Sequence, residues 1–236
     1  MRIAYLDCSR GINGVASLAA LVDAGADIDS LSKELGFLGG DLPILITEDV
    51  VVGEFRVRRV SVEGGEVSVG RRLADLEALL SAGGLPDAAR DLALRIYGRL
   101  AEAEARVHGS SPEAVRFHEV GSLRSVVGVV GTALAIGQLG IDSIVASPAP
   151  YGRGAVDTEH GRLAVPTPAT LELLRGMPVE PHDGSGELVT PTGAAILAAA
   201  ATSFGQIPAM TIESVGYGTG DPRNSAIVLR VVIGTS

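Results

Sequence analysis

The first 25 residues, MRIAYLDCSRGINGVASLAALVDAG (1–25), decide the fold class of this chain. Arg2 to Cys8 alternate in polarity and are apolar enough for a buried strand. Residues 9–14 are rich in glycine and asparagine and predict a turn. Residues 15–24 then follow a helical pattern, and Gly25 stands where a helix-ending glycine is expected. The result is a strand–loop–helix unit whose loop amides point toward whatever group lies at the helix N-terminus, a position that suits an anion.

The rest of the chain alternates between strand and helix patterns. Strands are predicted within 43–69, with a hairpin turn at Gly64-Gly65, and at 143–149, 210–215 and 226–233. Helices are predicted at 73–80, 87–107, 122–139, 167–174 and 192–203, and a further helix start at 110–113. This alternation predicts an α/β fold with a mixed sheet covered by helices. We expect one domain over residues 1–236, with a β-hairpin-rich lobe near residues 43–69.

Composition excludes several classes of protein. A hydrophobic fraction of 46% over 236 residues indicates a globular chain with a full core, and a net charge of −9 opposes binding to nucleic acid. The arginines at 56, 58, 59, 71 and 72 are most simply the solvent face of a hairpin. The lone Cys8 fits a reducing cytoplasm and a buried position. The uncharged run 125–141 is too short to span a membrane, and prolines interrupt 188–212, so we expect no membrane partner.

The block Phe117-His118-Glu119-Val120-Gly121 carries the most chemical information. An imidazole beside a carboxylate suits metal ligation or proton transfer. Adjacent residues diverge on regular structure, so His118 and Glu119 share a site only on a bend, which Gly121 allows. The alternative is a capping Glu119 and a core His118 hydrogen-bonded to the backbone.

Two later blocks also place polar side chains beside glycine and proline. His160 precedes Pro166 and Pro168, which stiffen a loop before a helix and would hold the imidazole in place; an ordinary turn residue is the alternative. The segment 187–195, ELVTPTGAA, places threonine hydroxyls at a helix N-terminus. Thr190 or Thr192 is either a plain N-cap or part of a phosphate or carboxylate site.

Together these blocks resemble the LarC family of nickel-insertion proteins, which act in synthesis of the nickel-pincer nucleotide cofactor. The resemblance covers most of the chain in order. It rests on Tyr5-Leu6-Asp7-Cys8, Phe117 to Gly121, His160-Gly161, Val165-Pro166, Pro168 to Leu171, Glu187 to Ala195 and Gly216-Tyr217-Gly218.

The resemblance implies a cytoplasmic, CTP-dependent cyclometallase of the lyase class. Such an enzyme places nickel into a pyridinium mononucleotide that carries two thiocarboxylates, forming a carbon–nickel bond. Imidazole and substrate sulfur fit the ligand preferences of nickel. Carried onto this sequence, the resemblance implies that the catalytic residues are Asp7, His118 and Glu119. It implies that the metal ligands are His118 and His160. The substrate-binding residues that it implies are Glu187, Thr190, Thr192 and Gly193.

The sequence also departs from the family pattern. The family has an aspartate where this chain has Val15, acidic residues where it has Arg124 and Gly128, and a histidine-rich stretch near residues 62–72. Family members usually continue into a C-terminal domain associated with CTP binding and oligomer assembly, and this sequence stops at Ser236.

We therefore expect weak nickel binding by the chain alone, and binding of CTP, with a divalent metal, only through a separate CTP-binding subunit. A homo-oligomer is also compatible with the family. Two alternatives stay open. One is a diverged, non-catalytic paralogue that binds a nucleotide-like ligand or a protein; the other is a hydrolase that uses His118 and Glu119 as acid and base.

Overall fold

The computed structural model describes residues 1–38, 44–63, 70–117, 120–220 and 227–236. Its helices are α1 (Gly14–Asp23), α2 (Ile28–Glu34), α3 (Leu73–Ala82), α4 (Asp87–His108), α5 (Leu123–Gln138), α6 (Pro168–Leu173) and α7 (Pro191–Ala200), with 3₁₀ turns η1 (Leu35–Leu38) and η2 (Pro112–Ala114). Its strands are β1 (Arg2–Asp7), β2 (Ile44–Val52), β3 (Phe55–Glu63), β4 (Arg71–Arg72), β5 (Arg116–Phe117), β6 (Ser143–Ala146), β7 (Ala149–Arg153), β8 (Ala155–Thr158), β9 (Gly161–Ala164), β10 (Val179–Ser185), β11 (Ser203–Phe204), β12 (Thr211–Thr219) and β13 (Leu229–Thr235).

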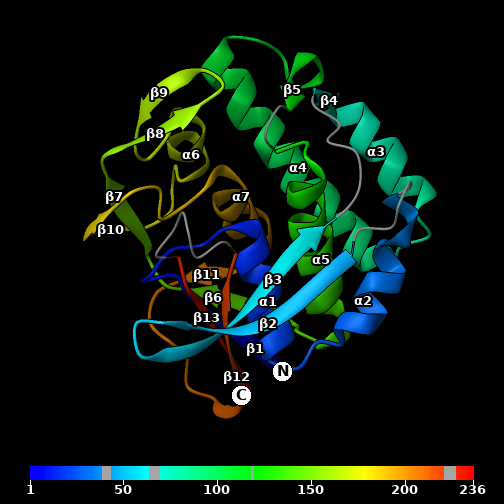
Figure 1. The fold of residues 1–236 in the computed structure, drawn as a ribbon, viewed down its shortest axis with the longest axis vertical. Helices are drawn as coiled ribbons and strands as arrows, with labels where there is room; N and C mark the ends of the chain where they lie inside the picture. The colour runs from blue at the N-terminus through cyan, green and yellow to red at the C-terminus, as the bar shows by residue number, and fades with distance from the viewer. Residues whose placement is uncertain (39–43, 64–69, 118–119, 221–226) are drawn as a thin grey trace.

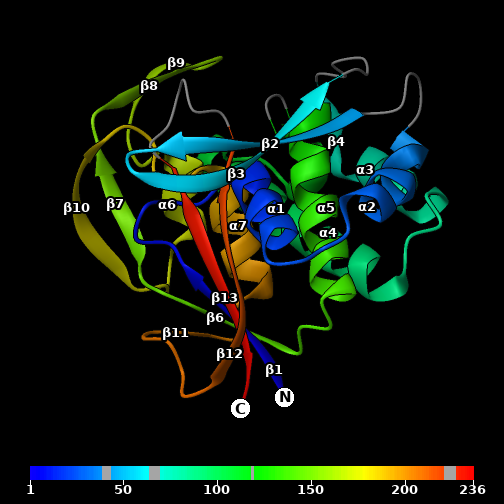
Figure 2. The ribbon, with the colours of Figure 1, turned by 60° about the horizontal axis from the view of Figure 1, so that its bottom comes forward.

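A seven-stranded mixed sheet organises the molecule, in the order β11-β6-β1-β13-β12-β3-β2 (Figures 1 and 2). The first strand, β1, runs parallel to β6 and antiparallel to β13, and β13 pairs antiparallel with β12. Because the last strand lies beside the first, the two chain ends meet, and Ser236 N donates a hydrogen bond to Met1 O at 3.2 Å. The predicted α/β fold with a mixed sheet is confirmed.

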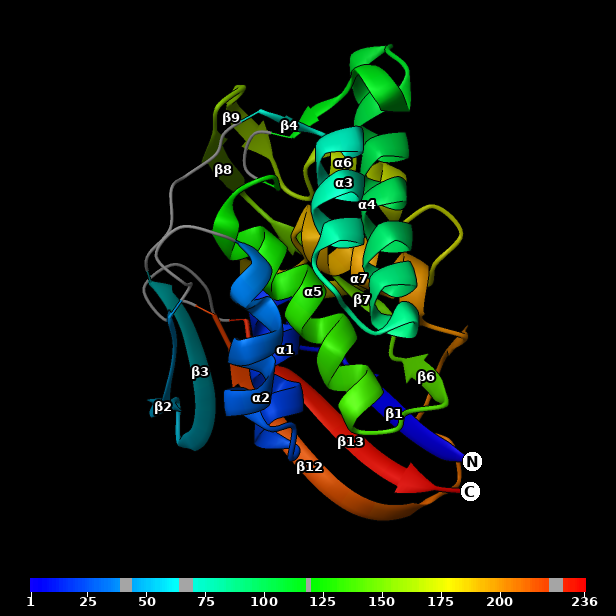
Figure 3. The same ribbon diagram turned by 90° about the vertical axis from the view of Figure 1, so that its right-hand side faces the viewer.

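The helices stack on one side of the sheet (Figure 3). Helix α1 packs on β12, β3 and β13, α5 packs on α1, and α4 packs on α5 and α7. Glycines allow the first of these contacts. A Cβ atom at Gly216 would lie 2.0 Å from Ala20 O, and one at Gly218 would lie 2.1 Å from Ala20 N. The bare backbone of β12 therefore lets α1 rest directly on the sheet.

Strands β2 and β3 form a hairpin at one edge of the sheet, where β3 pairs with the end of β12. The turn is at Gly53, whose φ of 66° is the left-handed region that glycine favours. The arginines of this hairpin are paired with carboxylates. Arg56 lies 2.7 Å from Asp23 and 3.1 Å from Asp49, and Arg58 contacts the same two groups at 3.7 and 3.3 Å. This agrees with a surface role for the basic cluster.

The elements differ from the prediction in several places; for example, the strand predicted at 143–149 is divided into β6 and β7, and β10 is an additional strand. The helix predicted to run to Ser203 ends at Ala200, because Thr202 N donates to Ile144 O and the following residues join the sheet as β11. The hairpin β8–β9 and helix α2 were not predicted. The predicted turn at Gly64-Gly65 lies outside the described residues.

Two features bear on the physical class of the chain. Across the described residues, the structure contains no helix with the length and apolar character needed to cross a bilayer. Cys8 is fully buried, and burial raises the pKa of its thiol to about 12, so the thiol stays protonated at neutral pH. This agrees with the predicted buried role.

Candidate metal-handling site

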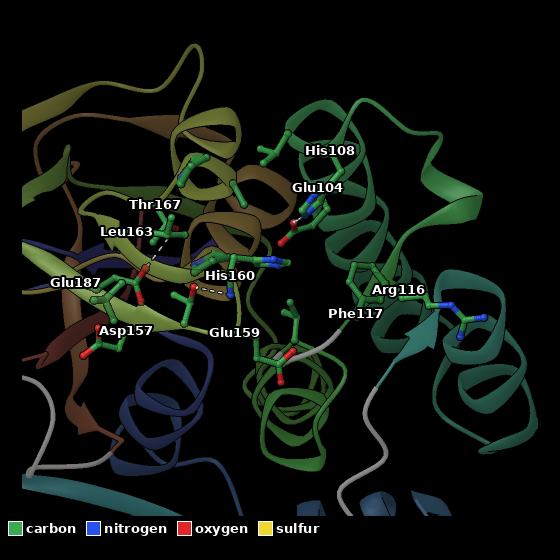
Figure 4. A pocket seen from close by; sticks show the side chains of 17 residues that line it. Glu104, His108, Arg116, Phe117, Asp157, Glu159, His160, Leu163, Thr167 and Glu187 are labelled. Atoms are coloured by element: carbon green, nitrogen blue, oxygen red, sulfur yellow. Dashed lines mark hydrogen bonds and ion pairs between the residues drawn. The ribbon is translucent and has the colours of Figure 1, made fainter.

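A cavity of about 260 Å³ opens between the C-terminal part of α4, the β8–β9 hairpin and the N-terminal ends of α6 and α7 (Figure 4). We call it the imidazole cavity. Helix α4 contributes Glu104 and His108, and the turn of the β8–β9 hairpin contributes His160. Its wall also includes Phe117 and Val120. Segments far apart in sequence thus supply one lining.

Two imidazoles face each other in this cavity. The ring centroids of His108 and His160 are 5.0 Å apart, with the ring planes at 50°. His108 Nε2 also lies 3.5 Å from the Glu104 carboxylate one helical turn away. On the other side, the His160 backbone N–H donates to Thr158 Oγ1 at 3.1 Å, and that hydroxyl donates to Gly161 O at 2.9 Å. The hairpin turn therefore fixes the backbone that carries His160.

The imidazole cavity is acidic. Among the described residues, its lining includes the carboxylates of Glu104, Asp157, Glu159 and Glu187 and a single guanidinium, that of Arg116. Arg116 donates to a backbone carbonyl, Gly70 O, at 3.4 Å, and Figure 4 shows its side chain directed away from the two histidines. Carboxylates and imidazoles favour a cation in this space.

A second cavity, of about 210 Å³, adjoins the first. Val120, Glu187 and Pro191 line both. Three helices begin at it: α1, α5 and α7. Their caps are ordinary, since Asn13 Oδ1 accepts from Ala16 N at 2.7 Å, Ser122 Oγ from Ser125 N at 3.4 Å and Thr190 Oγ1 from Gly193 N at 3.2 Å. We call this space the N-terminal cavity.

The structure brings several predicted site residues together. His160 and Glu187 line the imidazole cavity, and Glu187, Thr190 and Thr192 line the N-terminal cavity. Gly193 lines neither of them. A Cβ at Gly193 would lie 2.3 Å from Ile12 O, so this glycine permits close packing of α7 on the loop before α1.

His118 and Glu119 lie outside the described residues. Their neighbours on both sides, Phe117 and Val120, line the imidazole cavity. Their predicted roles in metal binding and catalysis stay predictions.

Asp7 lies apart from these groups. It lines a different, smaller cavity with Tyr217 and Arg230, and its carboxylate forms an ion pair with Arg230 and accepts from Ser9 N at 3.0 Å. Burial alone would raise the pKa of Asp7, but hydrogen bonds from Ser9 and the charge of Arg230 outweigh it and hold the pKa below its ordinary value. Among the described residues, Asp7 and His160 therefore line different cavities.

Sequence reasoning missed Glu104 and His108. Their spacing of four residues puts both side chains on one face of α4, which was visible in the sequence. Nothing local showed that this face meets the β8–β9 hairpin. The sequence by itself therefore predicts only a helix over residues 87–107.

The positions that depart from the LarC pattern also converge. Val15 and Arg124 line the N-terminal cavity. Gly128 packs against the start of α1, where a Cβ at Gly128 would lie 2.9 Å from Gly14 C. At two of the positions where the resemblance implied acidic side chains, this cavity has the apolar Val15 and the guanidinium of Arg124.

Fold and cavity together define an α/β protein with an imidazole- and carboxylate-lined site, a donor set that suits a borderline metal ion such as nickel. Residues 4–236 match the family described as "Nickel insertion protein". This chain belongs to that family.

Curated relatives agree. A "Putative nickel insertion protein" of Geotalea daltonii is 44% identical over 241 residues, covering 99% of this chain and 61% of the relative. A "Pyridinium-3,5-bisthiocarboxylic acid mononucleotide nickel insertion protein" of Desulfitobacterium hafniense is 43% identical over 220 residues, covering 93% of this chain and 55% of the relative. The chain thus spans about three fifths of the length of these relatives. No solved structure matches it.

Proposed function

We propose that this chain takes part in nickel-pincer cofactor synthesis, as the part of a nickel-insertion protein that presents nickel to a pyridinium bisthiocarboxylate mononucleotide. Nickel is here a substrate. The observation that carries the proposal is the pair of imidazoles, His108 and His160, 5.0 Å apart in a cavity rich in carboxylates. Family membership and the name of the Desulfitobacterium relative supply the substrate class.

An incomplete ligand set suits a metal that must leave. Within the described ranges, no group of three or more His, Cys, Asp or Glu side chains is arranged to hold a metal ion. The His108 and His160 imidazoles would start the coordination of nickel, and the soft sulfurs of the substrate would complete it. A closed protein cage would instead retain the ion.

Forming a carbon–nickel bond at a ring carbon releases the proton that this carbon carried. An imidazole or a carboxylate close to the ring can accept it. We assign this step to the His118-Glu119 pair, because Phe117 and Val120 on either side line the imidazole cavity. Asp7 is retained as a proposed catalytic residue on the resemblance alone, since its contacts are with Ser9 and Arg230.

We further propose that insertion depends on CTP and a divalent metal held by a separate CTP-binding subunit. A triphosphate is repelled by the carboxylates of the imidazole cavity, and the side chain of Arg116, which also lines it, points away. Binding of CTP at this cavity would need more positive charge than its lining supplies.

A second candidate function has its own support. The N-terminal cavity carries Val15 and Arg124 where the resemblance implied acids, which favours a diverged paralogue that binds a nucleotide-like ligand without metal chemistry. This candidate predicts ligand binding without nickel-dependent product. The hydrolase alternative has no such observation.

Titration with nickel, followed by an insertion assay with the bisthiocarboxylate mononucleotide and CTP, tests the first proposal. We expect weak nickel binding by the wild type, and a loss of affinity of at least about tenfold in His108→Ala and in His160→Ala, because each removes a ligand. His118→Ala should abolish insertion. CTP should be consumed only when a CTP-binding subunit is added.

His182→Ala is the matched control. This imidazole accepts from Gly184 N at 2.8 Å, lines neither cavity, and should leave nickel affinity unchanged. Equal nickel affinity in wild type, His108→Ala and His160→Ala would overturn the assignment of the imidazole cavity. Saturable mononucleotide binding with no nickel-dependent product would favour the second candidate.

A further inference from the structure

The N-terminal cavity gathers the starts of three helices of ten or more residues, which is an unusual concentration of backbone donors. The first N–H groups of a helix have no partner within the helix. The caps account for Ala16, Ser125 and Gly193. Among the described residues, no acceptor is found for the backbone N–H groups of the lining residues Gly14, Val15, Arg124 and Thr192.

Thr192 adds an independent feature. Its side chain is 8% exposed and lines the cavity, and within the described part of the chain its hydroxyl has no hydrogen-bond partner. A hydroxyl in this position is able to donate a hydrogen bond to a ligand in the cavity. The Thr192 methyl group lies against Gly14, 2.9 Å from where a Cβ of Gly14 would stand. The hydroxyl is therefore the polar group that Thr192 offers to the cavity.

Arg124 supplies a full positive charge to the same space. It is exposed and lines the cavity, and no described carboxylate lies within ion-pair distance of it. Each helix N-terminus carries roughly half a positive charge. Three of them with one guanidinium roughly match the charge of about −2 that a phosphate monoester carries at neutral pH. The opposing charge is Glu187, which accepts a hydrogen bond from Thr167 at 3.4 Å on the side of the imidazole cavity.

We propose that the N-terminal cavity binds the phosphate monoester of a mononucleotide, with Arg124, the Thr192 hydroxyl and the free N–H groups of α1, α5 and α7 as its donors. The inference rests on the nucleotide-like ligand that both candidate functions share, and it requires no metal. Because Val120, Glu187 and Pro191 line both cavities, a phosphate held here places the rest of the nucleotide toward His108 and His160.

Nickel-free calorimetry with nicotinate mononucleotide, nicotinate riboside and inorganic phosphate tests this subsite. We expect the wild type to bind the mononucleotide at least about tenfold more tightly than the riboside, since several charge-assisted hydrogen bonds are involved. Inorganic phosphate should compete with the mononucleotide. Arg124→Gln should remove about tenfold of the affinity for the mononucleotide and leave the riboside unchanged.

Thr192→Val keeps the shape of the side chain and should weaken mononucleotide binding, whereas Thr192→Ser keeps the hydroxyl and should retain it. Arg95→Gln removes the same charge as Arg124→Gln from an exposed position on α4, outside both cavities, and is the control.

Three results would overturn the phosphate subsite. The first is equal affinity of the wild type for mononucleotide and riboside, and the second is an unchanged ratio of these two affinities in Arg124→Gln. The third is the absence of saturable mononucleotide binding. A failure of the nickel titration leaves this result standing, because no metal is present. Conversely, a chain that takes part in nickel insertion but binds mononucleotide and riboside equally would contradict the phosphate subsite and still support the proposed function.

Discussion

Asp7 and Arg230 are Cα partners on neighbouring strands β1 and β13. A buried carboxylate needs a partner to offset its desolvation, and the register of the two strands supplies one. His108 and His160 are also brought together from distant parts of the sequence, but they do not form an ion pair with each other. Two imidazoles in a cavity lined by carboxylates suit the binding of a ligand.

The Asp7–Arg230 pair gives a pH-dependent prediction at this scale. The pKa of Asp7 is held below its ordinary value, so the pair stabilises the fold above that value and the stabilisation is lost as pH falls through the lowered pKa. Asp7→Asn should reduce the free energy of unfolding at pH 7 by about 1 kcal/mol, a modest figure because the Arg230 side chain is 48% exposed. Urea unfolding between pH 7 and pH 3 measures this.

The difference from wild type should narrow toward acid. Arg230→Gln should reproduce most of the loss, and Arg153→Gln, an exposed arginine on β7, should not. A loss that stays constant down to pH 3 would show that Asp7 acts through packing and not through its charge.

At the scale of elements, the contact between α1 and β12 positions the N-terminal cavity. Helix α1 begins at this cavity and lies on Gly216 and Gly218 of β12. Any side chain there would lift α1 from the sheet and shift Gly14 and Val15 away from the other two helix starts. Close backbone packing thus determines where the donors of α1 point.

Gly218→Ala should therefore lower the free energy of unfolding by roughly 1–3 kcal/mol or more, the cost of forcing atoms into a packed contact. Thermal or urea unfolding measures the change. Gly98→Ala is the matched control, since a Cβ at Gly98 in α4 meets nothing within 4 Å. It should stabilise by about 0.5–1 kcal/mol, because alanine is the better helix former. A neutral Gly218→Ala would mean that α1 can move off the sheet at little cost.

At the scale of the whole molecule, one core joins the helical layers to the sheet. Leu100 of α4 and Ile233 of β13 belong to the same cluster of buried side chains, although they come from opposite layers. A continuous core of this kind favours a single cooperative unit.

We expect one unfolding transition that both layers share. Leu100→Ala and Ile233→Ala should each lower the free energy of unfolding by about 2–5 kcal/mol, the usual cost of a cavity in a core. Circular dichroism at 222 nm, which reports helix, and hydrogen exchange of β13 amides should give the same midpoint in each variant. Separate midpoints would show two units of folding.

Local sequence patterns were sufficient for much of the secondary structure. The start of the chain, α4 and α5 have clear periods, and their ends are marked by caps such as Asn13, Ser122 and Gly109. The end of α7 was misjudged because nothing local stops it; the competing partner is Ile144, far away in sequence. The β8–β9 hairpin was missed because its strands are short and mostly exposed.

For the candidate site, the sequence determined which kinds of residue are available, and the resemblance pointed to His160, Glu187, Thr190 and Thr192. Only the tertiary structure paired His160 with His108, placed Asp7 against Arg230, and gathered three helix starts around Arg124. The physical reason is the separation along the sequence over which each effect acts. Periodicity and capping act over a few residues, whereas a cavity is formed by side chains whose separation depends on how every intervening element packs.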